Sequence, residues 1–287
     1  MAVRETKRYL GLELSGAKNQ KTCVATLEYY PKQGKIFLLD LYDKIAPTED
    51  QSSDQALLEL IQEVGESMVC LGVNVPLQLP PCVTCTRKHC PMPTHCSVPT
   101  VKWMREFMKK VSRQSPQLIH ARTKEFTPYT QRPIELWLKY QLLPELPAHI
   151  RLEVDESMGG NKAPLSARMS FLKRHLESVS LVEVWPKLAV ALLGMELGLT
   201  KRHLTEYRQL EEGGELREEF LLELAHQHEI FIYDRDLRKL SQSLTAFDAF
   251  ICAYVALLSD HQGCAKKPPA QEFPSQAGWI HYPKIEW

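Results

Sequence analysis

The chain has 287 residues, 44% of them hydrophobic and 24% charged, which is typical of a globular protein rather than a disordered one. Thirty-five basic residues balance thirty-five acidic ones, so the bulk charge gives no argument for nucleic acid, and such binding would need a local patch. The apolar runs are shorter than the ~18 to 20 residues of a membrane-spanning helix, and the first residues do not resemble a signal peptide. We therefore expect a cytoplasmic protein that does not enter a membrane.

The first third of the chain predicts three consecutive strands. Residues 9–14 form a short apolar run that ends at the turn-forming pair Ser15-Gly16. Residues 22–30 alternate and favour β structure, 31–34 predict a turn, and 35–42 resume as a strand. Strands joined by such short connections favour an antiparallel meander.

A helix and a buried strand are predicted next. Ser52 and Gln55 have the spacing of a capping box, the apolar residues of 52–65 share one face, and Gly65 stands where a C-terminal cap belongs. Residues 68–75 are then almost continuously apolar, which is typical of a strand covered on both faces in a parallel sheet. The helix would therefore form a right-handed crossover to this strand.

The middle of the chain predicts an insertion followed by a basic amphipathic helix. Residues 78–99 are rich in proline and contain four cysteines, so we expect an irregular, metal-braced segment. Residues 101–111 carry an apolar stripe, and basic residues lie on another side of the same helix. The basic residues, which form either a solvated face or a surface that grips nucleic acid or a partner protein, are Lys102, Arg105, Lys109 and Arg113.

The remaining residues predict more helices and one more buried strand. The helices are expected at 133–142, 164–177, 215–228 and 245–258, and the last of these is apolar on nearly all sides. Residues 179–184 predict a buried strand, with Pro186 at the first position of the next helix, and 279–282 predict a final edge strand. This order indicates an α/β fold with a mixed sheet of five strands and helices on both faces, which resembles the RNase H-like arrangement. We expect one domain over 1–287 with an inserted metal-binding lobe at 78–115.

The cysteine cluster has the strongest motif in the chain. Cys82, Cys85, Cys90 and Cys96 place four thiolates within 15 residues, which is the ligand number of a closed tetrahedral zinc site. His95 in place of Cys96 would give the spacing of a zinc knuckle. An iron–sulfur cluster is the alternative cofactor, since four cysteines also hold one and Pro91 follows Cys90 directly. A closed site of either kind would be structural.

Four polar residues interrupt the apolar elements. They are Glu13 in the first strand, Asn74 after the fourth, Glu183 in 179–184 and Asp248 in the last buried helix. A buried carboxylate is costly unless it is paired or bound to a metal. Several such side chains at one point would form a Mg²⁺ or Mn²⁺ site able to support phosphodiester hydrolysis.

Each of these residues also has a structural interpretation. Thr245 and Asp248 have the spacing of a capping box, so Asp248 would then only cap a helix. Glu183 would instead pair with a basic side chain such as Lys187. Glu13 would be a polar residue satisfied at a strand end.

Several short motifs together resemble an uncharacterised family of predicted RNase H-like nucleases. The motifs, in order along the chain, are GLELSG, CLGVNVPLQLP, Arg132-Pro133-x-Glu135, VEVWP, AFDAFICAYVAL and GWIHYP. The family shows Gly-Ile-Asp in its first strand, then Asp-Ala-Pro-Leu-Gly, an Arg-rich segment, Glu-Val-Tyr-Pro and an Asp-Ala helix. The match covers most of the chain, and the order of the motifs is what carries the resemblance.

The resemblance implies a metal-dependent nuclease with Arg132 and Glu135 near the same site, as a phosphate contact and as a ligand or base. The sequence departs from the family where Glu13 replaces an aspartate and where Asn74 replaces another, which removes one negative charge. A binding protein without catalysis on the same fold is the alternative. An actin-like ATPase is a third hypothesis, with 159–162 (Gly-Gly-Asn-Lys) as the nearest phosphate loop.

Overall fold

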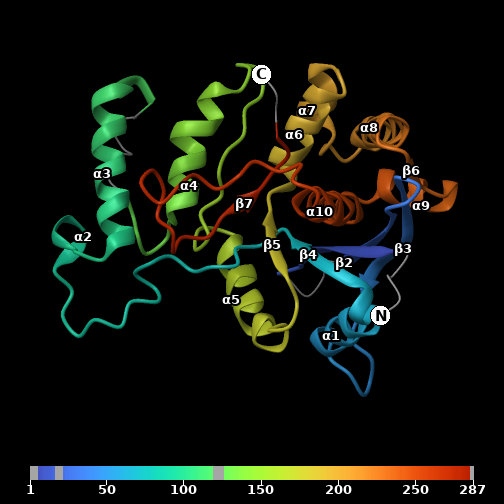
Figure 1. Ribbon diagram of the computed structural model, residues 1–287, viewed down its shortest axis with the longest axis horizontal. Helices are drawn as coiled ribbons and strands as arrows, with labels where there is room; N and C mark the ends of the chain where they lie inside the picture. The colour runs from blue at the N-terminus through green and yellow to red at the C-terminus, as the bar shows by residue number, and fades with distance from the viewer. Residues whose placement is uncertain (1–5, 17–21, 119–125, 285–287) are drawn as a thin grey trace. The chain divides into compact units, whose positions relative to one another are not determined.

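The structure is a computed structural model that describes residues 6–16, 22–118 and 126–284 (Figure 1). The chain forms two compact units. Unit 1 comprises Met1–Val75, Arg168–Ala265 and Ile280–Trp287, and unit 2 comprises Pro76–Ala167 and Lys266–Trp279. The lobe predicted at 78–115 is thus one part of a larger second unit.

Unit 1 contains a seven-stranded mixed sheet of order β6-β3-β2-β1-β4-β5-β7. The strands are β1 (Lys7–Glu13), β2 (Thr22–Tyr30), β3 (Lys35–Ile45), β4 (Met68–Val73), β5 (Leu181–Val184), β6 (Ile230–Phe231) and β7 (Ile280–His281). Strands β3, β2 and β1 are antiparallel, and the other neighbouring pairs are parallel. The α/β class and the antiparallel meander are therefore confirmed, and β1 lies at the centre of the sheet.

The sheet has two strands more than the five expected. Strand β7 is the predicted final edge strand, shorter than the range 279–282. Strand β6 was not predicted, because a strand of two residues is too short to show an alternating pattern. Both additional strands lie at the ends of the sheet, so they leave the arrangement around β1 unchanged.

Helix α1 (Ser53–Val64) lies where the sequence placed it. The Ser52 hydroxyl accepts a hydrogen bond from the backbone N–H of Gln55 (3.3 Å), and the Gln55 side chain accepts one from the N–H of Ser52 (2.9 Å). Gly65 ends the helix with a positive φ of 61°. The predicted capping box and C-terminal cap are thus both confirmed.

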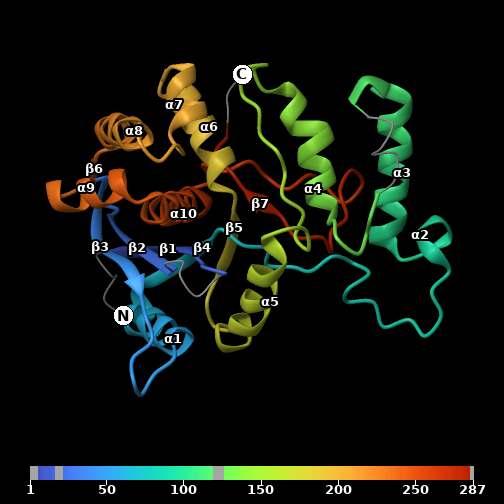
Figure 2. The same ribbon diagram turned by 180° about the vertical axis from the view of Figure 1, so that it is seen from behind.

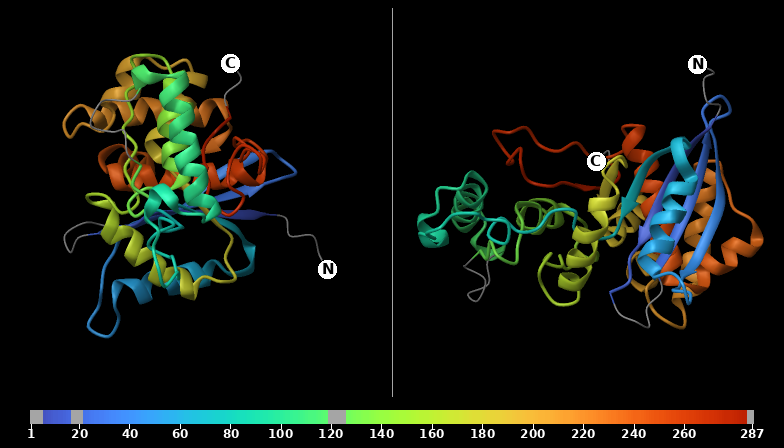
Figure 3. Two further views of the ribbon diagram at one scale, coloured as in Figure 1. Left: turned by 90° about the vertical axis from the view of Figure 1, so that its left-hand side faces the viewer. Right: turned by 90° about the horizontal axis from the view of Figure 1, so that it is seen from below.

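Helix α10 (Leu244–Asp260) is the buried centre of unit 1. It packs on β1, β2 and β4, and α1 lies on the other side of the strands (Figures 1 and 2). In the right-hand view of Figure 3, α1 lies in front of the strands and the C-terminal helices lie behind them. The sheet of unit 1 is therefore covered on both faces, as its apolar strands predict.

Two glycines let α10 approach the sheet closely. A Cβ atom on Gly11 would lie 1.9 Å from the carbonyl oxygen of Ala249, and one on Gly72 would lie 2.2 Å from that of Cys252. Such distances to backbone atoms exclude any side chain. The sequence GLELSG therefore needs its glycine for helix packing, and the packing fixes which part of α10 covers the strand ends.

The remaining helices outside the 76–161 segment lie close to their predicted positions where one was predicted, but their lengths differ from the prediction. They are α5 (Lys162–Leu172), which begins in unit 2 and ends in unit 1, and α6 (Pro186–Glu196), α7 (Lys201–Glu206), α8 (Gly213–Gln227) and α9 (Asp234–Gln242). Pro186 begins α6, as predicted, because its missing N–H costs nothing at a helix start. Helices α7 and α9 were not predicted.

Unit 2 is mainly helical in the residues that the structure describes. Its helices are α2 (Met92–His95), α3 (Pro99–Gln114) and α4 (Pro133–Trp137). A π-helical turn, Leu138–Leu142, continues α4 over the rest of the predicted helix. Apolar side chains from α3 and from the α4 segment form the core here, among them Met104, Met108, Val111, Leu136 and Tyr140.

No single helix among the described residues is long and apolar enough to cross a membrane. Helices α9 and α10 pass that test only when they are taken together, and they are bent by 113° relative to each other.

Candidate functional site

Glu13 and Asn74 meet at the carboxyl ends of two adjacent parallel strands in unit 1. Leu12 of β1 and Val73 of β4 are register partners, and the backbone N–H of Asn74 donates to the Leu12 carbonyl (3.1 Å). The Asn74 side-chain amide donates to Oε2 of Glu13 at 2.7 Å. A hydrogen bond to an ionised carboxylate is about twice as strong as a neutral one, so the amide orients the carboxylate.

The first turns of α10 cover the same end of the sheet. Cys23 is the register partner of Glu13 on β2, and its Sγ lies 3.4 Å from Oγ1 of Thr245 in α10. The opposite end of α10 lies at the beginning of β1, where Tyr9 donates to Asp260 (2.6 Å). Asp248 therefore belongs to the half of α10 that covers the carboxyl ends of the strands.

Asp248 is buried, with 2% of its surface exposed, and forms an ion pair with Arg208. Nη1 of Arg208 lies 3.0 Å from each carboxylate oxygen of Asp248. Burial alone would lower the pKa of Arg208, but the charges of Asp248 and Tyr207 and the hydrogen bonds to both side chains together outweigh it, and the pKa is raised. The pKa of Tyr207 is also raised, first by burial and then by the charge of Asp248.

The capping interpretation of Asp248 is wrong. Ser243 is the N-cap of α10, and its hydroxyl accepts from the backbone N–H of Ala246 at 3.3 Å. Asp248 lies beyond the first turn, where the backbone N–H groups already have helical partners. Its carboxylate is therefore held by Arg208, a residue 40 positions earlier that no sequence pattern singled out.

Glu183 lies on β5, in the next strand of the sheet, and is 4% exposed. It is the register partner of Val73, whereas Val182 is that of Gly72, which faces α10. Because side chains alternate along a strand, the register assigns Glu183 to the face opposite that of Glu13. Its charge still acts on His281 of β7. Burial lowers the pKa of His281, and the charge of Glu183 opposes part of this decrease.

Arg168, which the sequence did not single out, lies beside the segment that follows Glu13 and is paired with Asp54. Its Nη1 donates to the carbonyl oxygen of Ser15 (2.6 Å), two residues after Glu13, and lies 3.3 Å from the hydroxyls of Ser15 and Thr22. Its Nε donates to Asp54 at 2.8 Å. Arg168 could have been identified only from the tertiary structure, because it reaches the end of β1 from α5.

Arg132 and Glu135 form a buried pair within unit 2. Both side chains are at most 4% exposed, and Nε of Arg132 donates to Oε1 of Glu135 at 2.8 Å. The Glu135 carboxylate also accepts from the backbone N–H groups of Arg132 (2.8 Å) and Ser157 (3.0 Å). Three donors stabilise the charge, so this carboxylate orders the start of α4.

The four cysteines of the segment 82–96 lie in unit 2 at different depths, and the structure does not gather them into the predicted cluster. Cys85 and Cys90 are exposed, Cys82 is half-buried and Cys96 is buried. The pKa of Cys82 is raised first by burial and then by Cys96, Cys85 and Cys90, so all three thiols are close enough to influence it. None of the eight cysteines forms a disulfide.

The cysteine loop is tied to the basic helix. Nη1 of Arg105 donates to the carbonyl oxygens of Pro93 (2.9 Å) and Cys96 (3.0 Å). Arg105 thus supports the loop, while Lys102, Lys109 and Arg113 are exposed on α3. Across residues 6–16, 22–118 and 126–284, no three His, Cys, Asp or Glu side chains are grouped so that they could hold one metal ion.

Comparisons with known protein families, curated proteins and solved structures found no match to this chain. The candidate site therefore depends on its own geometry. That geometry joins Glu13 to Asn74 and Asp248 to Arg208, and it places Arg168 beside the end of β1.

Proposed function

We propose that this chain is a divalent-metal-dependent nuclease of the RNase H-like type, with its site at the carboxyl end of β1. The observation that carries the proposal is the 2.7 Å hydrogen bond between Glu13, at the end of the central strand, and Asn74 of the adjacent parallel strand. Ligands of open α/β sheets bind outside the carboxyl ends of such strands. The antiparallel meander followed by parallel strands supports the fold assignment.

The residues of this edge suit a hard cation. Mg²⁺ is commonly held by one or two carboxylates together with waters and substrate phosphates. Glu13 and Asp248 supply carboxylates, and the amide oxygen of Asn74 supplies a neutral donor. The register assigns Glu183 to the other face, so the proposal rests on the first three residues. A bound cation would neutralise phosphate charge and activate a water molecule.

Two arginines complete the proposed site. Arg168 lies at Ser15, directly beyond Glu13, where a guanidinium can contact a phosphate group of the substrate. Arg208 neutralises Asp248 and would have to release it when a cation binds. Glu13, which Asn74 holds in place, would orient the attacking water or accept a proton from it. Glu135 accepts three hydrogen bonds in unit 2, and we assign it a structural role there.

We propose that the cysteine cluster holds a structural ion, zinc in preference to an iron–sulfur cluster. The four thiols at Cys82, Cys85, Cys90 and Cys96 are the donor set of a closed tetrahedral site. Two observations support it: three of the thiols raise the pKa of the fourth after burial, and two of them are exposed to an entering ion.

A non-catalytic binding protein on the same fold is the second candidate. The arrangement that favours it is the Arg208–Asp248 pair, in which both carboxylate oxygens already accept hydrogen bonds. Asn74 in place of a carboxylate points in the same direction, since it lowers the negative charge of the site. The exposed basic residues of α3, Lys102, Lys109 and Arg113, would then contact nucleic acid or a partner protein.

The deciding experiment measures metal binding and cleavage on the same samples. Thermal melts with and without millimolar Mg²⁺ or Mn²⁺ are combined with cleavage of single-stranded and double-stranded DNA, RNA and an RNA–DNA hybrid. The proposal expects metal stabilisation and cleavage that Glu13→Gln abolishes and that Glu59→Gln, an exposed control on α1, leaves intact. A wild type that neither binds the cations nor cleaves any substrate would establish the binding protein instead.

The same samples test the actin-like ATPase. The segment 159–162 forms a turn that leads into α5. ATP hydrolysis that continues in the Glu13→Gln variant, without cleavage of any nucleic acid, would favour that third hypothesis.

A further inference from the structure

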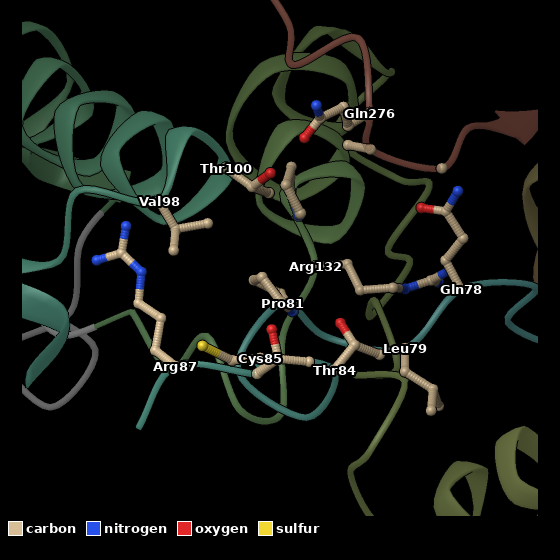
Figure 4. Close-up of a pocket in the computed structure, with 14 residues that line it drawn as sticks. Gln78, Leu79, Pro81, Thr84, Cys85, Arg87, Val98, Thr100, Arg132 and Gln276 are labelled. Atoms are coloured by element: carbon tan, nitrogen blue, oxygen red, sulfur yellow. The ribbon is translucent and has the colours of Figure 1, made fainter. Parts of the chain in front are cut away.

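Unit 2 contains a pocket with a volume of about 350 Å³. Its walls come from the segment 78–87, the beginning of α3, the beginning of α4 and the segment 276–278 (Figure 4). All of these segments belong to unit 2. The pocket is therefore a feature of one compact unit, whereas the proposed nuclease residues belong to unit 1.

The lining of the pocket has positive charge and no negative charge. Arg87 and Arg132 line it, and none of the other lining residues is an aspartate or a glutamate. In the view of Figure 4, the two arginines lie on either side of Pro81. Their guanidinium groups point to opposite sides, that of Arg87 toward Val98 and that of Arg132 toward Gln78. An anionic group would therefore meet one guanidinium and no carboxylate at the wall.

Arg132 is held in place before any ligand arrives. It is 4% exposed, and Nε donates to Glu135, whose carboxylate does not line the pocket. Arg87 is exposed, and its Nη1 donates to the hydroxyl of Ser97 at 3.1 Å. A planar guanidinium fixed by a neighbouring carboxylate loses little freedom when it binds phosphate, so the pocket is preorganised on the Arg132 side.

The other lining residues can recognise more than a charge. Gln78 and Gln276 each offer an amide with both donors and an acceptor, and Thr84, Thr86 and Thr100 offer hydroxyls. Apolar surface is provided by Leu79, Pro81, Val98 and Pro133. Amides beside flat apolar surface are suited to the edge and the face of a nucleobase, and Arg132 and the hydroxyls are suited to phosphate.

We propose that this pocket binds a phosphate-bearing ligand of the size of a mononucleotide. The phosphate lies at Arg132, on the preorganised side, and the base lies against the apolar wall within reach of Gln78 and Gln276, with Arg87 on the opposite side of the pocket. The volume is at the lower end of the range of about 300–1,000 Å³ for ligand pockets, so it accepts one nucleotide and no more. This site is additional to the proposed nuclease centre and does not depend on it.

Two sources share this chemistry, a free nucleoside monophosphate and one nucleotide of a single strand. The experiment is isothermal titration of the full chain, without added Mg²⁺, against inorganic phosphate, a nucleoside, the matching 5′-monophosphate and a trinucleotide. We expect the monophosphate to bind at least tenfold more tightly than either phosphate or the nucleoside. Tighter binding of the trinucleotide would identify a strand, and equal binding would identify the free nucleotide.

Variants locate the site. Gln78→Ala and Gln276→Ala should each weaken monophosphate binding at least tenfold, while Arg151→Ala, an exposed arginine of the same unit outside the pocket, should leave it unchanged. Arg132→Gln combined with Glu135→Gln removes both buried charges together, so the fold is kept while binding should be lost. Glu13→Gln should have no effect.

The proposal is overturned if the wild type binds neither nucleotide at millimolar concentration. It is also overturned if binding survives Gln78→Ala and Gln276→Ala, because the ligand then lies elsewhere. Loss of binding in Glu13→Gln would also overturn it, because the ligand would then bind at the proposed nuclease site. Failure of the nuclease assay leaves these outcomes unaffected, so the two proposals fail separately.

Discussion

Arg208 holds Asp248 by a single nitrogen, Nη1, which lies 3.0 Å from both carboxylate oxygens. The two side chains differ in exposure, since 31% of the Arg208 side chain and 3% of the Asp248 side chain reach solvent. Removing Arg208 should therefore affect stability differently from removing Asp248. A carboxylate that loses its arginine stays buried with one fewer positive partner, whereas an arginine that loses its carboxylate can still contact water.

We predict that Arg208→Ala destabilises the protein more than Asp248→Asn does. Removal of one partner of a fully buried pair costs about 3–5 kcal/mol, and the partial exposure of Arg208 reduces this to about 1–3 kcal/mol. Urea unfolding at neutral pH measures both variants. If Asp248 also takes part in a cation site, millimolar Mg²⁺ should restore more stability to Arg208→Ala than to the wild type.

Arg202→Ala is the matched control, because Arg202 pairs with Glu206 and Glu212 on the surface. Exposed pairs contribute about 0–1 kcal/mol, so this variant should unfold close to the wild type. Equal losses in Arg202→Ala and Arg208→Ala would show that burial of Asp248 has no energetic consequence.

The arrangement around β1 was predictable because its signals are local. The apolar runs at 9–14 and 68–75, the turn at 31–34 and the capping box at Ser52 determine strands and a crossover without knowledge of distant contacts. Strand β6 was not predictable, since two residues are too few to show an alternating pattern of apolar and polar side chains. Helix α9 is amphipathic, but it contains only two apolar residues, Leu237 and Leu240, among many charged ones, so no apolar run marks it in the sequence.

The candidate site was predictable in its residues but not in their partners. Glu13, Asn74 and Asp248 are conspicuous because polar groups interrupt apolar elements. Arg208 and Arg168 lie in helices among many other basic residues, and nothing local distinguishes them. Their roles arise from tertiary packing, which brings α10 onto Gly11 and α5 onto the end of β1.

The close packing of α10 on β1 should depend on Gly11. A Cβ atom there would lie 1.9 Å from the Ala249 carbonyl oxygen, a backbone atom that can move only if the helix moves. We predict that Gly11→Ala costs at least about 3 kcal/mol, the upper range for overpacking. Chemical denaturation measures the loss, and any Mg²⁺ stabilisation should disappear with it.

Gly214→Ala is the control for this effect. A Cβ atom at Gly214, in the first turn of α8, would lie 3.5 Å from its nearest neighbour, an ordinary contact. Alanine favours a helix over glycine by about 0.5–1 kcal/mol, so this variant should be neutral or more stable. A mild effect of Gly11→Ala would contradict the packing described for α10.

The bond between Tyr9 and Asp260 should make stability depend on pH. Burial would raise the pKa of Asp260, but the hydrogen bonds from Tyr9 and Lys7 outweigh it, so the pKa is lowered. A lowered folded-state pKa gives stability that is present above the unfolded pKa and is lost as the pH falls through the folded pKa. We predict that Tyr9→Phe costs about 0.5–1.5 kcal/mol at pH 7 and less near pH 3.

Urea unfolding of wild type and Tyr9→Phe at a series of pH values measures this difference. Tyr30→Phe serves as the control, because Tyr30 donates to Glu28 (2.7 Å) and makes no bond to Asp260. This variant therefore leaves the bond between Tyr9 and Asp260 intact. A Tyr9→Phe difference that grows below pH 4 would have the wrong sign for a lowered Asp260 pKa.

The cysteine loop should lose its order when a thiol is removed. If Cys82, Cys85, Cys90 and Cys96 hold one ion, purified protein should contain one equivalent of zinc, or iron and sulfide in the alternative case. Cys90→Ser should reduce the metal content and lower the melting temperature, since metal binding is coupled to folding of such a segment. Elemental analysis and thermal melts on one preparation give both results.

Cys264→Ala provides the comparison, because Cys264 is a buried thiol of unit 1 whose Sγ contacts the Val255 carbonyl. It should change stability but leave the metal content unchanged. A fully folded wild type that contains neither zinc nor iron would end the metal interpretation of the cluster.

Asn74→Asp offers the most direct test of the proposed nuclease centre. The Asn74 amide donates to Glu13 at 2.7 Å, and an aspartate there would place a second carboxylate against the first. Without metal, two such charges raise at least one pKa of the pair. A raised carboxyl pKa reduces stability at high pH and restores it as the pH falls, so the variant should be less stable than wild type at pH 8 and closer to it at pH 5. A divalent cation should reverse the loss, because it neutralises both carboxylates.

Thermal melts at both pH values, with and without Mg²⁺, give the four melting temperatures required for the Asn74→Asp test. The Asn74→Ala variant separates loss of the amide from gain of the charge. If Asn74→Asp gains no more stability from Mg²⁺ than Asn74→Ala does, Glu13 and residue 74 do not share a cation, and the binding protein becomes the better assignment.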